Sequence, residues 1–597
     1  MARRRTKIVC TIGPSCNDER ALVEMICAGM DVARFNLSHG TREEHGINIQ
    51  RVKSASNRLG KRVGIMLDTR GPEIRLGRFE GGKAFLKEGS LFVLTIEDIT
   101  GTPEICSVSF DQISQIVSPS SVILLDDGNI ELEVVEVSDD QITTKVLNNG
   151  FLSDRKKVYI PGAKIEGLPA LSDSDREDIV FATQYGIDFV AASFIRSSDD
   201  VTDVRRVLEE AGSTARIIAK IESVQGVSAL NEILRSADGL MVARGDLGVE
   251  YPPEDIPILQ KKMIKECNKI GKPVITATQM LESMIENPRP TRAEASDVAN
   301  AIFDGTDAVM LSGETAYGKY PVEAVEFMAK IAVRADENLD PQVFFSRISE
   351  SSTNVTESVS RSAVSSAIDL CASAIITPTE SGYTARMVSR FRPPIPIFAV
   401  SPHDATCGWL TCVWGVETSL GPSLARSVQS DGESLWGEYE DVSDMAIDVL
   451  RRSGWISNGD LCVLTKGIPM GVSGTTNVME VRTVGDVLLK GSGIGQTSAC
   501  GEVVVATSGE EAVQKVQAGC VLVVPHLDVS FIPALEKTCA LIIEQGGLTS
   551  DGAIFALEFG IPAVVGAADA VTLLKDGDIV TVDGTRGLVY AGIVTVK

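Results

Sequence analysis

The sequence predicts an α/β protein built on a (β/α)8 TIM barrel, with a β-barrel-like insertion and two further C-terminal domains. Short apolar runs alternate with helical patterns along the first 345 residues, and most of these runs end in polar side chains. Such alternation is typical of parallel strands joined by right-handed crossovers. The chain has 597 residues, which is too long for one core and predicts three or four domains.

Eight apolar runs are the candidates for the barrel strands. They are Lys7–Ile12, Val32–Leu37, Val63–Leu67, Phe189–Phe194, Ile217–Ile221, Gly239–Ala243, Pro273–Ala277 and Ala308–Leu311. Helical patterns such as Glu19–Ala28 and Glu254–Ile270 separate them. Eight such units favour a closed barrel over an open sheet, formed by residues 1–70 and 170–345.

Polar residues cluster at the ends of these runs, where barrels of this class build their active sites. Lys220 and Glu222 are two residues apart in an apolar run, so their side chains leave the same face of the strand. Asp246 follows the next run. A cation beside two carboxylates suits a divalent metal and a transferring anion, whereas a surface ion pair is the alternative for one motif alone. Because the pattern recurs, it predicts an enzyme. Further members of this polar set are Arg34, Asn36, Ser38, Asp68, Thr69, Ser193, Thr278, Gln279, Ser312 and Glu314.

Composition limits the partners. The net charge of −25 argues against nucleic acid and requires that a site for an anionic substrate be locally cationic. No apolar run reaches the roughly 18 residues that span a bilayer, so no membrane partner is expected. Twelve cysteines without a CxxC pair favour reduced thiols in a cytoplasmic protein.

The remaining domains follow from changes in pattern. Residues 71–169 contain alternating segments such as Ile130–Val135 and are expected to form a β-domain inserted at the catalytic end, where it can act as a lid. Alternation of strands and helices returns in residues 346–484, which predicts an α/β domain. After the Gly/Ser-rich stretch at 490–495, residues 491–597 form a further domain.

Longer motifs surround the polar residues. They are Arg34–Gly40, Leu67–Arg75, Ile217–Ser223, Ala243–Leu247, Ala277–Met284 and Leu311–Thr315. In this order they resemble the motifs of the pyruvate kinase family, and the resemblance covers roughly residues 1–484. It implies transfer of a phosphoryl group from phosphoenolpyruvate to ADP, giving pyruvate and ATP.

The resemblance also implies roles. Glu222 and Asp246 would hold Mg²⁺ (or Mn²⁺), and Lys220 would stabilise the phosphoryl oxygens in flight. Arg34 would bind the substrate phosphate, and the N–H groups of Gly245 and Asp246 would receive the substrate carboxylate. Thr278 would either donate a proton to the enolate carbon or hold the water that does.

Two further sets of residues are implied in the same way. The family binds K⁺ at the positions of Asn36, Ser38, Asp68 and Thr69, and Glu73 matches its K⁺-dependent members. Nucleotide contacts are implied for Asn36, Leu37, Ser38, His39, Arg75 and Lys156. Lys157 stands where the family commonly has glycine. The match of Lys156 to the family's nucleotide-binding residue can therefore be displaced by one position.

In the α/β domain, a loop rich in hydroxyls follows a strand and precedes a helix. The resemblance favours a phosphorylated effector at this loop, formed by Thr377, Thr379, Ser381, Gly382 and Thr384, over an ordinary helix cap. The glycine-rich stretch 466–477 would close over it. The resemblance also implies a homotetramer.

The fourth region resembles the swivelling domain of phosphoenolpyruvate-utilising enzymes. That domain carries a phosphorylated histidine after a Ser or Thr, but Asp551 stands at this position here. A structural or regulatory role is therefore expected. A dikinase relative and a catalytically inactive regulator are the alternatives; the missing histidine opposes the first, and the unsubstituted catalytic positions oppose the second.

Overall fold

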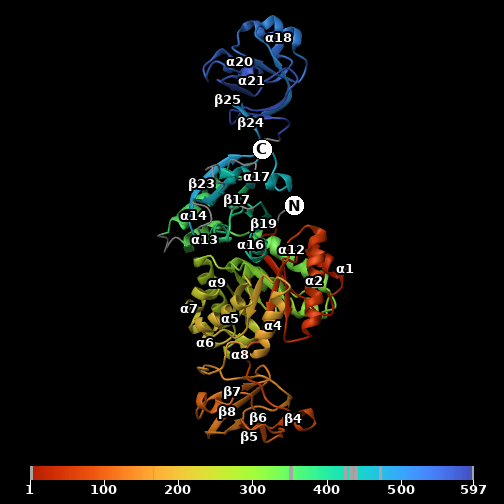
Figure 1. The fold of residues 1–597 in the computed structure, drawn as a ribbon, viewed down its shortest axis with the longest axis vertical. Coiled ribbons are helices and arrows are strands. Elements are labelled where there is room, and N and C mark those ends of the chain that lie inside the picture. Colours follow the sequence, from red (N-terminus) through yellow and green to blue (C-terminus); the bar gives the residue numbers. More distant parts are fainter. Residues whose placement is uncertain are drawn as a thin grey trace. The chain divides into compact units, whose positions relative to one another are not determined.

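The computed structural model describes residues 4–165, 167–348, 354–422, 427–428, 434–435, 441–468 and 474–594 (Figure 1). The chain divides into two compact units. The first comprises Met1–Val364, Thr379–Leu424 and Gly467–Asn477, and the second comprises Ser365–Pro378, Ala425–Lys466 and Val478–Lys597.

A closed barrel of eight parallel strands is the centre of the first unit, in the order β1-β16-β15-β14-β13-β12-β3-β2. The strands are β1 Lys7–Thr11, β2 Val32–Asn36, β3 Gly64–Asp68, β12 Phe189–Ala192, β13 Arg216–Ile221, β14 Gly239–Ala243, β15 Val274–Ala277 and β16 Ala308–Leu311. The predicted (β/α)8 barrel is confirmed, and each strand lies within two residues of its predicted bounds. Nearly every strand residue is buried, as expected for parallel strands covered on both faces.

Helices cover the outside of the barrel. The longer ones are α1 Glu19–Ala28, α2 Arg42–Leu59, α4 Asp173–Thr183, α5 Ser198–Glu210, α9 Ile256–Ile270, α10 Arg292–Asp304 and α12 Pro321–Glu337. Shorter ones are α6 Val224–Ser228, α7 Leu230–Ser236, α8 Arg244–Glu250, η2 Glu282–Ile285 and α11 Gly313–Ala316. Capping boxes begin α2, α4 and α10, where a Ser or Thr and an acid three residues later satisfy the free N–H groups. The α9 helix begins two residues after the predicted Glu254 because Asp255 is its N-cap.

The inserted domain leaves the barrel after β3 and returns before α4, so it is attached at the C-terminal end of the strands. Its elements are η1 Glu80–Gly82, β4 Lys83–Leu86, β5 Leu91–Thr95, β6 Ile105–Ser107, α3 Ile113–Ile116, β7 Val122–Leu125, β8 Ile130–Val137, β9 Gln141–Val146, β10 Gly150–Ser153 and β11 Val158–Tyr159. They form a six-stranded sheet, β11-β7-β8-β9-β5-β6, and the pair β10-β4 around a separate apolar core.

Strands and helices alternate again after the barrel, as predicted. The elements are α13 Pro341–Ile348, α14 Val355–Asp369, β17 Ala374–Pro378, α15 Tyr383–Ser389, β18 Ile397–Ser401, α16 Asp404–Leu410, β19 Val416–Leu420, β20 Ser427–Val428, β21 Ser434–Leu435, α17 Val442–Arg452, β22 Leu461–Gly467 and β23 Thr476–Thr483. In the first unit β18 pairs in parallel with β19, and in the second β17 pairs in parallel with β22.

The second unit contains an eight-stranded sheet in the order β24-β31-β30-β26-β27-β28-β29-β25. Its elements are β24 Val487–Lys490, β25 Ser492–Ile494, β26 Ser498–Val505, α18 Gly509–Lys515, β27 Cys520–Val524, η3 Val529–Phe531, α19 Ile532–Leu535, β28 Thr538–Ile543, α20 Asp551–Phe559, β29 Ala563–Val565, α21 Ala570–Leu573, β30 Ile579–Asp583 and β31 Leu588–Ala591. Two apolar cores stabilise it. Within the described parts of the chain, no helix is both long and apolar enough to cross a membrane.

Candidate active site

Lys220, at the end of β13, lies at the centre of a buried polar cluster. Its ammonium lies 3.1 Å from Asp68 Oδ1, 3.1 Å from Glu222 Oε1 and 2.6 Å from Ser193 Oγ. Asp68 is the last residue of β3, Glu222 follows β13 and Ser193 follows β12, and these three strands are neighbours in the barrel. Parallel strands ending at one edge thus bring together residues more than a hundred positions apart, as the polar strand ends predict.

Arg34 adds a second cation on the neighbouring strand β2. Its Nε lies 2.5 Å from Asp68 Oδ2, and its Nη1 donates to Thr11 Oγ1 at 2.8 Å. Burial alone would raise the pKa of Asp68, but Arg34 and Lys220 outweigh it and lower that pKa. The carboxylate is therefore charged and holds the two cations side by side, where a phosphate can reach both.

Glu222 and Asp246 are two further carboxylates whose charges act on Lys220. Glu222 is 1% exposed and accepts a hydrogen bond from the Phe194 N–H at 2.7 Å. Burial and the negative charge of Asp246, opposed by Lys220, raise the pKa of Glu222 to about 7. Two neighbouring carboxylates whose negative charges repel each other suit a hard divalent cation, which would neutralise both.

The carboxylates do not complete a metal shell on their own. Among the residues with described positions, no group of three or more His, Cys, Asp or Glu side chains could hold a metal ion. Mg²⁺ is commonly bound by one or two carboxylates and completes its shell with water and substrate oxygens. The donor set of Glu222 and Asp246 therefore fits that ion.

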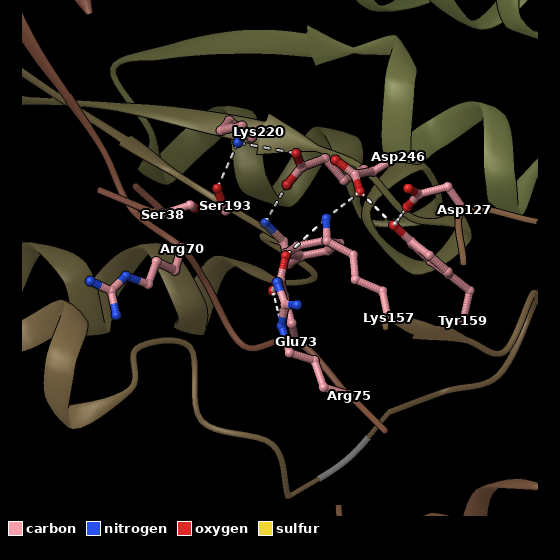
Figure 2. A network of polar contacts seen from close by, with 12 residues as sticks. Ser38, Arg70, Glu73, Arg75, Asp127, Lys157, Tyr159, Ser193, Lys220 and Asp246 are labelled. Atoms are coloured by element: carbon pink, nitrogen blue, oxygen red, sulfur yellow. Dashed lines mark hydrogen bonds and ion pairs between the residues drawn. The ribbon is translucent and has the colours of Figure 1, made fainter. Parts of the chain in front are cut away.

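Two residues of the insertion, not assigned to the site from the sequence, contact Asp246 (Figure 2). Lys157 Nζ lies 2.8 Å from Asp246 Oδ1 and 2.8 Å from Glu73 Oε1. The Tyr159 hydroxyl donates to the same Asp246 oxygen at 2.7 Å. The two residues are two positions apart in an extended segment, which places their side chains on one face. That spacing is visible in the sequence, but which face meets the barrel is not.

Thr278 and Gly245 contact each other. The Gly245 N–H donates to Thr278 Oγ1 at 2.9 Å, and this hydroxyl donates to the Ala277 carbonyl at 2.7 Å. Thr278 has a φ of 67°, and Phe194 and Gln279 also have positive φ values. Such conformations are costly for non-glycine residues and are found at functional sites. The Gly245 N–H is thus paired with Thr278 in this structure.

The residues of the implied K⁺ site lie on adjacent strands. Asn36 and Asp68 are direct partners in the pairing of β2 with β3, and the Ser38 N–H donates to Asn36 Oδ1 at 3.1 Å. The Thr69 carbonyl accepts a hydrogen bond from Ser193 at 2.7 Å. These four residues are thus brought to one part of the barrel end.

The implied nucleotide residues fall into two groups. Asn36 and His39 line a cavity of about 790 Å³ that also includes Arg34 and Thr278. Leu37, which follows Asn36 in the sequence, is buried. Its carbonyl accepts a hydrogen bond from Arg70 Nε at 2.7 Å. Arg75 and Lys156 belong to the insertion. Arg75 binds Glu73 at 2.7 Å, whereas Lys156 pairs with Asp126 at 2.6 Å and Lys157 reaches Asp246.

The residues of the implied effector loop are divided between the two compact units. Thr377 belongs to the second unit, whereas the other four residues belong to the first. There, Thr379 Oγ1 accepts from the Gly382 N–H at 2.9 Å, and Thr384 is hydrogen-bonded to Thr476 at 2.6 Å. Residues 469–473 of the glycine-rich stretch lie outside the described residues.

Asp551 is exposed at the first position of α20, which begins after Ser550. The Ser550 hydroxyl donates to the Gly547 carbonyl at 2.7 Å. The segment lies between β28 and β29, and the carboxylate of Asp551 stands at the start of the helix that joins them.

Comparisons with known proteins agree with this geometry. Residues 3–325 match the family model for the pyruvate kinase barrel domain, residues 357–482 match the pyruvate kinase alpha/beta domain, and residues 516–587 match the mobile domain of PEP-utilising enzymes. Pyruvate kinase of Geobacillus stearothermophilus is 50% identical over 594 residues, and that of Bacillus licheniformis is 48% identical over 593 residues; each alignment covers 99% of both chains.

A solved structure extends the likeness to three dimensions. The crystal structure of a pyruvate kinase from Cryptosporidium parvum aligns with a TM-score of 0.74 and 41% identity, covering 81% of this chain and 96% of that one. The family models together cover more than half of the chain, and the Geobacillus relative aligns over 99% of its own length. The chain therefore belongs to the pyruvate kinase family, whose members are phosphotransferases.

Proposed function

We propose that this chain transfers the phosphoryl group of phosphoenolpyruvate to ADP, giving pyruvate and ATP. The observation that carries the proposal is the buried cluster in which Lys220 and Arg34 share Asp68 while Lys220 also pairs with Glu222. Phosphoryl transfer depends on positioning and charge neutralisation more than on covalent chemistry. Two fixed cations next to a pair of metal-binding carboxylates provide both.

Each residue has a role in this scheme. Arg34, a planar fork, would orient the substrate phosphate, and Lys220 would stabilise the oxygens of the phosphoryl group as it moves. Glu222 and Asp246 would hold Mg²⁺ or Mn²⁺, which when bound neutralises charge on the phosphate. Thr278 would deliver a proton to the enolate carbon, directly or through a held water, and the N–H groups of Gly245 and Asp246 would receive the substrate carboxylate.

We also propose that Asn36, Ser38, Asp68 and Thr69 bind K⁺. Their convergence on adjacent strands supports this set. Because Asp68 and Thr69 are adjacent in sequence, one of the two would contribute its backbone carbonyl. The nucleotide would occupy the cavity lined by Asn36 and His39, with Arg75 and Lys156 reaching it from the insertion, which acts as a lid.

The regulatory part of the proposal concerns the α/β domain. A phosphorylated small molecule would bind in the first unit at Thr379, Ser381, Gly382 and Thr384. The chain would assemble as a homotetramer in the cytoplasm. Titrating sugar phosphates and nucleotides against the saturation curve for phosphoenolpyruvate tests the first statement. Sedimentation equilibrium tests the second.

The reaction itself is tested by measuring pyruvate formed from phosphoenolpyruvate with Mg²⁺ and K⁺ present. Pyruvate is expected only when ADP is added, and turnover is expected to fall when K⁺ is replaced by an inert cation. Sustained formation of pyruvate with AMP and phosphate or pyrophosphate in place of ADP would favour the dikinase alternative, and absence of pyruvate under all conditions would favour an inactive regulator. Full turnover without K⁺ would remove the proposed K⁺ site.

A further inference from the structure

We propose that Lys157 is a positioning residue that occupies the metal-binding carboxylate Asp246 in the metal-free protein and competes with the divalent cation for it. The inference rests on the proposed metal site of Glu222 and Asp246. It goes beyond that site because it assigns a role to a lysine of the insertion that is not one of the proposed metal ligands.

The geometry around Asp246 supports this competition. Lys157 Nζ and the Tyr159 hydroxyl both bind Oδ1 of Asp246, at 2.8 and 2.7 Å. The side chain of Asp246 is 26% exposed, and that of Lys157 is 25% exposed. One carboxylate oxygen thus already has two donors, and one of them carries a full positive charge.

Lys157 has further contacts that would keep its ammonium near the site when a metal ion binds Asp246. Glu73 Oε1 lies 2.8 Å from its ammonium, and the rings of Phe194 and Tyr159 lie 5.4 and 6.0 Å away. An ammonium over aromatic faces is stabilised by their quadrupoles. On metal binding Lys157 can therefore give up Asp246 and retain Glu73, which avoids leaving a partly buried charge without a partner.

The contact also joins the insertion to the barrel. The two segments that connect them are paired, because the Val158 N–H donates to the Ile74 carbonyl at 2.8 Å and the Leu76 N–H donates to the Lys156 carbonyl at 2.9 Å. Lys157 extends from this pair to Asp246 in α8 of the barrel. Exchange of Lys157 for a metal ion at Asp246 would thus remove one ionic contact that holds the insertion against the barrel.

Electrostatics predicts the direction of the effect. The Lys157 ammonium and a metal ion at Asp246 would both be positive and would repel each other, and a divalent ion doubles this repulsion relative to a monovalent one. Removal of the Lys157 charge should therefore tighten metal binding. Removal of the neutral Tyr159 hydroxyl should change it much less.

Binding of Mn²⁺ to the full-length protein without substrates, followed by electron paramagnetic resonance of free Mn²⁺, tests the inference. Lys157→Met is expected to bind Mn²⁺ on the order of tenfold more tightly than the unmodified chain. Lys157→Arg, which keeps the charge, and Tyr159→Phe should stay near the unmodified value. Lys145→Met, at an exposed position on β9 of the same domain, controls for the change in net charge.

Two outcomes separate this inference from the proposed function. If Glu222→Gln loses Mn²⁺ binding but Lys157→Met binds no more tightly than the unmodified chain, the metal site holds and the competition is refuted. If Glu222→Gln keeps full Mn²⁺ binding, the metal site is elsewhere and both are refuted. Thermal unfolding in EDTA verifies that each variant is folded. If Lys157→Met does not fold, Lys157→Gln, which also removes the charge, takes its place with the same expected result.

Discussion

Thr278 illustrates, at the scale of the residue, how the site combines strain with hydrogen bonding. Its φ of 67° is unfavourable for a β-branched residue, and its hydroxyl connects Ala277 to the Gly245 N–H that opens α8. Both proposed routes for the proton need this hydroxyl. Thr278→Ser should therefore keep most of the turnover, whereas Thr278→Ala should lower kcat by about 10²-fold or more. Measurement of pyruvate formation by both variants tests this, and equal rates would exclude a role for the hydroxyl.

At the scale of the residue, the sequence indicated which side chains carry the chemistry but not always which way they point. Spacing alone put Lys220 and Glu222 on one strand face, and their ammonium and carboxylate lie 3.1 Å apart. The sequence did not show which of Lys156 and Lys157 faces the site, because adjacent residues of an extended segment point to opposite sides. Only the packing of the insertion against the barrel decides which of the two reaches Asp246.

At the scale of the element, the N-terminal ends of the strands show a different use of charge. Asp31, which precedes β2, is 6% exposed; it accepts from Arg4 at 2.7 Å and from the Ile8 N–H at 2.8 Å. Burial alone would raise the pKa of Asp31, but Arg4, Lys61 and Lys7 lower it well below its usual value of 3.8. Removal of one partner of a buried ion pair costs about 3 kcal/mol. Asp31→Asn should lower the free energy of unfolding of the barrel by that amount at pH 7.

The pH dependence follows from the direction of the shift. Because the folded-state pKa of Asp31 is depressed, its stabilisation is complete above the unfolded-state value of about 4 and is lost as the pH falls below it. Urea unfolding at pH 7 and pH 3 should therefore give a larger difference between Asp31→Asn and the unmodified chain at pH 7. Glu24→Gln, which removes the exposed pair with Arg20, serves as the control and should have little effect at either pH. A difference that grows toward pH 3 would contradict this account.

The elements themselves were predictable because their periodicity is strong. All eight barrel strands were found from apolar runs, since a strand buried on both faces has few polar residues. The start of α9 was placed two residues early because Glu254 is compatible with a first helical turn, although Pro252 and Pro253 mark the turn that extends to the N-cap Asp255. The order of strands in the insertion and in the C-terminal sheet depends on long-range pairing and could not be derived from local pattern.

At the scale of the whole molecule, the C-terminal sheet has its own cores, and none of the proposed catalytic residues belongs to it. A chain that ends at residue 484 should therefore keep the Lys220 cluster and form pyruvate in the standard assay. Loss of all activity, with the truncated protein still folded by circular dichroism, would show that catalysis requires the C-terminal domain.

The Asp551 position makes a second prediction at this scale. A carboxylate cannot replace the imidazole of a phosphohistidine carrier, so residues 516–587 should take up no phosphate. Incubation of the full chain with labelled phosphoenolpyruvate, followed by peptide mass spectrometry, should find this segment unmodified. Phosphate on Asp551 or a neighbouring residue would instead indicate a carrier function.

The central claim is that Lys220 acts on the phosphoryl group while Glu222 and Asp246 hold the metal. The most direct test is kcat for pyruvate formation by Lys220→Met, measured together with its Mn²⁺ binding. Turnover should fall by about 10³–10⁵-fold, the range for cationic contacts to a transferring phosphoryl group, while Mn²⁺ still binds. Turnover within tenfold of the unmodified chain would contradict the claim.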